Sequence, residues 1–149
     1  MELLGGGASC HYNNTDATVN TFECEAYYEK KVALIKKIKV SVRLRIIAHI
    51  PKQTLDIKMY VGGLEVYKNP FPISAEYVPP MCADIMIDIG MCVALHQIHF
   101  DTSKECVTFQ LIGYFEAFAA RVDVIKENVG WNVPACPIPV DRRNLFLAK

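Results

Sequence analysis

The chain has 149 residues, of which 52% are hydrophobic and 21% are charged, and its formal net charge is zero. This length and composition indicate one packed domain over residues 1–149 and exclude an intrinsically disordered chain. Because positive charge is not in excess, and aromatic residues do not alternate with the basic ones, we expect no nucleic-acid binding.

Six cysteines are present, and no two of them form a CxxC pair. An even number at wide spacing is typical of a disulfide framework made in an oxidising compartment, with six buried thiols in a cytosolic protein as the alternative. Asn13, which begins the triplet Asn-Asn-Thr, is a candidate glycosylation site and agrees with secretion. We therefore predict a secreted protein with disulfides, whose pairing the spacing leaves open, among Cys10, Cys24, Cys82, Cys92, Cys106 and Cys136.

The N-terminal region, residues 1–22, is rich in Gly, Asn and Thr and predicts an irregular leader in which residues 5–7 form a glycine linker. Residues 1–7 have neither the basic segment nor the apolar run of a signal peptide, so a secreted chain would start here at a mature or engineered terminus. No apolar run approaches the roughly 20 residues of a transmembrane helix, and we expect no membrane-spanning segment. Residues 23–34 fit either a helical turn or a strand.

The stretch from Ile35 to Ile50 alternates strictly between apolar and polar residues over most of its length. Side chains alternate across a β-strand, so this period of two predicts a strand with one buried face. The apolar face should form the central wall of the core and consists of Ile38, Val40, Val42, Leu44 and Ile46. The other face carries the residues that we take as surface-binding candidates, which are Lys37, Lys39, Arg43 and Arg45.

A second alternating stretch, Thr54–Val61, is followed by Gly62-Gly63 and a short partner strand, Leu64–Tyr67. Two glycines supply the positive φ angles of a tight turn, so this segment predicts a hairpin. The proline-rich segments at residues 69–72 and 78–80 predict a loop that crosses to another sheet or edge.

Alternation then predicts three more strands, at residues 83–90, 92–100 and 106–125. In the last of these, the apolar parity changes between Gly113 and Ala120, which indicates a β-bulge or a break into two strands.

The C-terminal tail, residues 128–149, holds the only tryptophan, Trp131, and is proline-rich enough to lie along an edge. Short strands at even spacing, separated by Gly and Pro turns and without long helices, predict one all-β domain. Its architecture should be an antiparallel β-sandwich or flattened barrel, stapled by disulfides.

No motif in the sequence predicts catalysis. The chain contains no GxSxG, GxxxxGK[ST], HExxH or dinucleotide-binding pattern. His96 and His99, with Asp101, come nearest to a metal site, but positions three apart on a strand face opposite sides, so the two imidazoles should not converge. We expect no enzyme activity, no cofactor and no metal.

The basic face of residues 35–50 has three interpretations. The simplest is a solvated sheet face whose acidic partners come from Asp56, Asp84, Asp88 or Glu116. The second is docking onto an anionic surface such as lipid headgroups or polysaccharide. The third is membrane lysis by a cationic amphipathic segment that leaves the fold.

The aromatic and methionine residues also have two interpretations. Large rings and adaptable methionines suit a pocket for a hydrophobic ligand between two sheets, and they equally suit an ordinary core. The candidates for such a pocket are Met59, Phe71, Phe109, Phe115 and Phe118.

Two families share parts of this pattern. Pro79-Pro80-Met81-Cys82, Cys92-Val93 and Cys106-Val107-Thr108-Phe109 resemble an uncharacterised cysteine-rich secreted domain of insects and other arthropods, over about residues 40–124. That resemblance implies secretion and β structure, and it implies no known reaction. A cysteine expected in that family near Val124 is absent.

Asn69-Pro70-Phe71-Pro72, the Cys82/Cys92 pair and the ending Cys136-Pro137-Ile138-Pro139-Val140 resemble the ML lipid-recognition family. Its members are secreted sandwiches that hold a sterol or acyl chain between their sheets. The resemblance implies disulfides Cys10–Cys136 and Cys82–Cys92, with Cys24–Cys106 as the remaining pair.

We therefore predict a secreted, non-catalytic binding or structural protein that meets an extracellular partner, another copy of itself or an anionic surface. The first alternative is a carrier of a hydrophobic small molecule, and the second is a membrane-active, cytolytic protein.

Overall fold

The computed structural model describes residues 2–16, 19–31, 34, 36–50, 52–72, 78–101 and 103–131. Within these residues the chain forms strands and no helix, which confirms the all-β prediction. Accordingly, this part of the chain offers no helix capable of crossing a membrane. The strands are β1 (Glu2–Asp16), β2 (Val19–Lys31), β3 (Lys37–His49), β4 (Thr54–Val61), β5 (Leu64–Pro72), β6 (Val78–Met86), β7 (Ile89–Asp101), β8 (Cys106–Ala117) and β9 (Ala120–Trp131).

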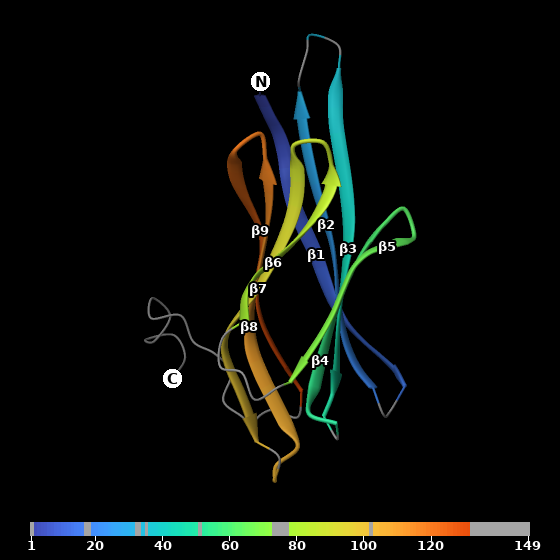
Figure 1. The fold of residues 1–149 in the computed structure, drawn as a ribbon, viewed down its shortest axis with the longest axis vertical. Helices are drawn as coiled ribbons and strands as arrows, with labels where there is room; N and C mark the ends of the chain where they lie inside the picture. The colour runs from blue at the N-terminus through green and yellow to red at the C-terminus, as the bar shows by residue number, and fades with distance from the viewer. Residues whose placement is uncertain are drawn as a thin grey trace.

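These strands form two antiparallel sheets that pack together as a sandwich (Figure 1). One sheet has the order β1-β2-β3-β4-β5 and the other the order β6-β7-β8-β9, so each strand pairs with its neighbour in sequence. The chain changes sheet between β5 and β6, as the proline-rich segments predict, through residues 73–77, which lie outside the described ones. At the margins, β1 lies against β9 and β5 against β6.

Strand β3 lies in the middle of the five-stranded sheet and has the two faces that its alternation predicts. Val40, Val42, Leu44 and Ile46 are buried, and Ile38 is half-buried and packs against them. Apolar residues of the other sheet complete this core, including Met91, Val93, Leu95, Phe109, Leu111 and Phe115.

The predicted hairpin of β4 and β5 is confirmed. Gly62 and Gly63 form its turn with φ angles of 58° and 84°, in the left-handed region that favours glycine. Strand β5 is longer than predicted, because it stays paired with β4 through Pro70 and Pro72. Prolines are tolerated there because β5 is an edge strand, and one side of its backbone needs no ladder partner.

The single strand predicted over residues 83–90 is wrong. A hairpin turn at Ile87 and Asp88 separates β6 from β7, and Asp88 has a φ of 63°. A two-residue turn by itself reverses the odd–even parity, because Met86 and Ile89 on its two sides lie opposite each other. A register shift between Asp84 and Met86 adds one residue and reverses the parity again, so the alternation continues through the turn as if the strand were unbroken. Ile87 consequently lies at a hairpin tip with 88% of its surface exposed.

Of the two causes predicted for the change of parity after Gly113, the break into two strands is the one that produces it. Strands β8 and β9 are separate and meet at a turn formed by Phe118 and Ala119, whose φ angles are 52° and 64°. The register shift opposite Gly113 and Tyr114 adds Val124 to β9, and it restores the odd parity from Ile125 onward. The backbone N–H of Phe118 donates to the carbonyl of Asp88 at 3.0 Å, so the turns of the two hairpins are joined.

The irregular leader predicted for residues 1–22 is wrong, because β1 and the start of β2 occupy most of it. The glycines that suggested a linker lie inside β1, with Gly5 and Gly7 under the ring of Tyr27 and Gly6 facing Val122 and Val124 of β9. A Cβ at Gly7 would lie 3.3 Å from a carbon of that ring, so the close contact suits a residue without a side chain. Residues 23–34, which fit either structure, belong largely to β2.

Two disulfides join directly opposed residues of neighbouring strands. Cys10–Cys24 links β1 to β2, and Cys82–Cys92 links β6 to β7. The predicted framework and the Cys82–Cys92 pair are confirmed. The other two pairs implied by the ML resemblance, Cys10–Cys136 and Cys24–Cys106, are wrong because Cys10 bonds Cys24. Cys106 is also disulfide-bonded, and Cys136 lies outside the described residues, as does most of the predicted tail.

We expect Leu44→Asp to prevent folding, because Leu44 is 1% exposed and a buried, unpaired carboxylate is strongly disfavoured. Circular dichroism and size-exclusion chromatography measure the result. Ser41→Asp, on the exposed face of the same strand, is the control and should fold. A folded, monomeric Leu44→Asp variant would contradict the assignment of β3 to the core.

Replacing Cys10 and Cys24 together by Ser should lower the free energy of unfolding by about 3 kcal/mol. The bond closes a loop with a sequence separation of 14, and its removal frees the unfolded chain. Urea unfolding followed by tryptophan fluorescence measures the change. An unchanged midpoint would show that β1 is held by strand pairing alone.

Candidate functional site

The basic side chains of β3 lie on the outer face of the five-stranded sheet. Lys37, Lys39 and Arg43 are exposed, and Arg45 is half-buried, as the period of two predicts. The strand therefore presents a row of cations to solvent. What this row can bind depends on how much of its charge neighbouring strands neutralise.

Strand β2 supplies the neutralising carboxylates. Glu23 lies opposite Arg45, Glu25 opposite Arg43, and Glu29 opposite Lys39. Three of the four predicted acidic partners are wrong, and the fourth, Asp56, pairs with β3 at His49 and not at the basic residues. Asp84, Asp88 and Glu116 belong to the other sheet, in β6, the β6–β7 turn and β8. Asp56 lies on β4, and its Oδ2 is 3.1 Å from His49 Nε2. Alternation in β3 shows which face is charged, but the strand register decides which acids lie beside it.

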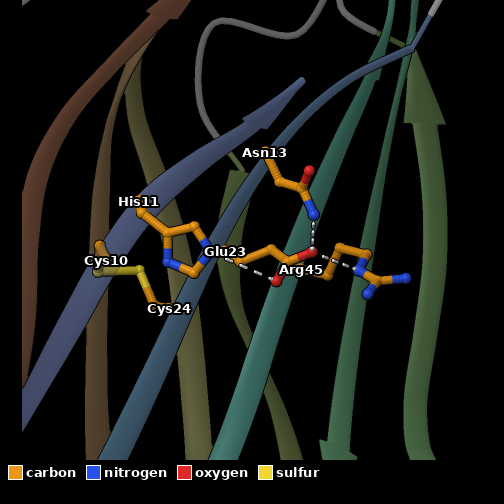
Figure 2. Close-up of polar contacts among 6 residues, drawn as sticks. All are labelled: Cys10, His11, Asn13, Glu23, Cys24 and Arg45. Atoms are coloured by element: carbon orange, nitrogen blue, oxygen red, sulfur yellow. Dashed lines mark hydrogen bonds and ion pairs between the residues drawn. A yellow bond between two sulfur atoms is a disulfide. The ribbon is translucent and has the colours of Figure 1, made fainter. Parts of the chain in front are cut away.

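Glu23 is the centre of a polar cluster on this face (Figure 2). Its side chain is only 8% exposed, and Oε1 accepts hydrogen bonds from Arg45 Nε at 3.1 Å and Asn13 Nδ2 at 3.3 Å. His11 Nε2 lies 3.8 Å from Oε2, and the Cys10–Cys24 disulfide lies in the adjoining positions of the same two strands. The Glu23 carboxylate holds Arg45 in place and partly neutralises its charge, so Arg45 is less available to bind another anion.

Arg43 remains closer to solvent than Arg45. The guanidinium carbons of Arg43 and Arg45 lie 5.4 and 5.6 Å from the centre of the Tyr60 ring, so the ring stabilises both cations. A shallow depression of about 170 Å³ lies beside them, and a second one of about 370 Å³ lies between Tyr27 and Lys39.

Positive charge is least neutralised where β2 ends and β3 begins. Residues 29–39 contain five lysines and one glutamate, a formal charge of +4 in a chain whose net charge is zero. We call these lysines the lysine cluster, and they are Lys30, Lys31, Lys36, Lys37 and Lys39.

The register of β2 and β3 keeps these lysines close together. Lys31 lies directly opposite Lys37 of β3, so two like charges face each other, and on its other side it lies opposite Glu2 of β1. Lys37 Nζ lies 3.9 Å from Glu29 Oε1, whereas within the described residues Lys31, Lys36 and Lys39 form no salt bridge. The ammonium of Lys30 lies 5.2 Å from the centre of the Phe118 ring in the other sheet. An anion brought to this end would relieve the repulsion.

Three of the five residues proposed to line a hydrophobic pocket belong to the packed core. Met59, Phe109 and Phe115 are fully buried within the cluster of apolar side chains between the sheets. Phe118 is half-buried at the end of the sandwich, beside Lys30, and the side chain of Phe71 lies outside the described structure. The described positions therefore agree with the interpretation of these residues as core.

The two histidines of β7 lie on the same face, contrary to the sequence-based argument. His96 pairs with Gln110 and His99 with Thr108, because a register shift at Gln97, whose φ is 52°, adds a residue between them. Even so, the described residues contain no group of three potential metal ligands. Asp101 instead accepts hydrogen bonds from the hydroxyl of Ser103 at 2.6 Å and from its N–H and that of Lys104, which lower the pKa of its carboxyl.

A groove of about 600 Å³ lies on the outer face of the four-stranded sheet, over the Cys82–Cys92 disulfide. Asp84, Asp88 and Glu116 line it together with Arg121. The guanidinium of Arg121 is already engaged, because Nε donates to Asp123 at 2.7 Å and the group stacks on the Tyr114 ring at 3.8 Å. The groove therefore has an acidic lining, opposite in sign to the lysine cluster.

Asn13, the candidate glycosylation site, is half-buried, and its amide nitrogen donates a hydrogen bond to Glu23. A glycan attached to that nitrogen would replace one of the hydrogens of this donor group.

The sequence-based prediction of the basic site did not include Lys30, Lys31 and Lys36. Their signal is a pair of lysines on each side of four apolar residues, 32–35, a pattern that suits the end of a hairpin.

Searches against models of protein families, curated proteins and solved structures find no match for this chain. Both family resemblances drawn from its motifs therefore stay predictions.

Glu23→Ala should lower the free energy of unfolding by about 1.5–3 kcal/mol, because it leaves Arg45 and Asn13 without their buried acceptor. Glu25→Ala is the control. Glu25 lies two residues away on the same strand face but is exposed, and its loss should change stability by no more than about 0.5 kcal/mol. Chemical denaturation measures both, and equal losses would contradict a special role for the buried carboxylate.

Proposed function

We propose that this protein is a secreted, non-catalytic binding protein that holds to an anionic surface through the lysine cluster at the end of β2 and β3. The observation that carries the proposal is the pairing of Lys31 with Lys37 within a segment of formal charge +4. The two disulfides are compatible with secretion, because such bonds persist in oxidising compartments such as the extracellular space.

The charge is sufficient for such a role. Five lysines with Glu29 and Glu2 leave a formal charge of +3 at this end. A lysine near an anionic surface contributes about 1 kcal/mol, so this charge supplies a few kcal/mol. Strand pairing fixes the backbone positions of Lys30, Lys31, Lys37 and Lys39, which reduces the entropy lost on binding. The middle of the stripe is less suitable, because Glu23 and Glu25 lie opposite Arg45 and Arg43.

The alternatives have less support. A carrier of a hydrophobic ligand needs a cavity, and Met59, Phe109 and Phe115 instead pack in the core. Lysis by a segment that leaves the fold would remove β3 from the middle of its sheet and expose the buried face that includes Leu44. We assign no reaction to the chain.

Lys31→Glu combined with Lys37→Glu should weaken binding to anionic surfaces about 30-fold or more, because two contributions of about 1 kcal/mol each are lost. Retention on heparin and co-sedimentation with vesicles containing phosphatidylserine measure the change. Wild-type binding should also weaken as salt rises from 0.1 to 1 M, since the Debye length falls from about 10 to about 3 Å.

Lys58→Glu combined with Lys68→Glu is the matched control. These two lysines lie opposite each other on the same sheet, so the change in net charge is identical. The proposed function is overturned if the two double variants lose equal affinity, or if the wild-type protein binds neither heparin nor anionic vesicles.

A further inference from the structure

Leu34 is the most exposed large apolar side chain in the described structure, with 90% of its surface accessible. It lies in the connection between β2 and β3, within five residues of every member of the lysine cluster. A single exposed leucine is ordinary on a protein surface. An exposed leucine amid five lysines is a more specific combination, because the same few residues offer apolar area and positive charge.

The lysines flank this leucine on both faces of the hairpin. Lys31 and Lys37 project from the outer face of the sheet, whereas Lys30, one position away and opposite Ile38, lies on the inner face beside Phe118. Figure 1 shows that the adjoining ends of β2 and β3 extend beyond the β6–β7 and β8–β9 hairpins at the same end of the sandwich. A flat surface that approaches this end therefore meets the ends of β2 and β3, with the start of β1 beside them, before the other two hairpins.

We propose that this end docks onto an anionic lipid bilayer, with Leu34 in the boundary between headgroups and acyl chains and the lysine cluster against the lipid phosphates. The inference rests on the proposed function and names the anionic surface. Lysines suit such a boundary, because their stems lie along apolar material while the ammonium groups stay with the headgroups. A hydrated polysaccharide supplies the negative charge but no apolar phase for the leucine.

A second apolar tip at the same end supplies the contrast. Ile87, at the β6–β7 turn, is 88% exposed, nearly as much as Leu34. Its neighbours Asp84 and Asp88 line the acidic groove, and anionic headgroups repel carboxylates. The two tips thus match in exposure and differ in the sign of the surrounding charge, so the charge selects the β2–β3 tip for the membrane.

Leu34→Ser and Ile87→Ser test this selection in vesicles of phosphatidylcholine with phosphatidylserine. Leu34→Ser should weaken binding about tenfold, because the apolar contribution of one leucine is lost while every charge remains. Ile87→Ser should bind within about twofold of the wild type. Heparin retention should be unchanged in both variants, since neither alters a charge.

Leu34→Trp adds a spectroscopic measurement. Trp131, the only natural tryptophan, is 6% exposed, so its emission should respond little to vesicles. A tryptophan at position 34 should shift its emission to the blue on anionic vesicles and not on heparin. No shift, or an equal loss of binding in Leu34→Ser and Ile87→Ser, overturns the docking geometry.

The failures are distinguishable. If Leu34→Ser binds vesicles as tightly as the wild type while Lys31→Glu with Lys37→Glu does not, the lysine cluster binds anions without insertion, and only the inference made here is wrong. If the lysine variant also binds normally to vesicles and heparin, the proposed function fails as well.

Discussion

The pairing of β2 with β3 is the interaction on which the rest of this structure depends. It runs in unbroken register from Asn20 opposite Ala48 to Lys31 opposite Lys37. One face of this pair carries the apolar wall that packs against the second sheet, and the other face carries the charged row. Since side chains alternate across a strand, a shift of one residue would exchange these faces and remove both the core and the surface pattern.

The same register divides the charged face into two parts with different properties. Near its middle, Glu23 and Glu25 oppose Arg45 and Arg43, and the buried Glu23 cluster is a structural element of the sheet. Towards the end of the hairpin, the five lysines have two acidic neighbours, Glu29 on β2 and Glu2, which β1 places opposite Lys31. Zero net charge for the chain therefore conceals a strongly cationic end, and local charge is what a surface within a Debye length experiences.

Several polar and sulfur-containing side chains in the described structure have partners within the fold. The cysteines form disulfides, Asp101 accepts hydrogen bonds within its own turn, and Arg121 is paired with Asp123 and stacked on Tyr114. His96 and His99 come onto one face through a bulge, yet the described residues provide no third ligand for a metal. The hairpin tips expose Leu34 and Ile87, and the five lysines lie beside the first of these.

The sequence alone determined the fold class, the two faces of β3, the Gly62-Gly63 turn and the position at which β8 and β9 separate, because odd–even alternation and glycine angles are local properties. Local signals could not show that residues 2–16 form a strand, since that depends on pairing with β2 and on the Cys10–Cys24 bond. The alternation pattern also continued across the turn at Ile87, so it did not reveal that turn, and it did not reveal the bulge at Gln97. Only the tertiary structure decided which carboxylates neutralise the basic row and which lysines remain together, because contacts between strands follow from register, and register is a property of the whole sheet.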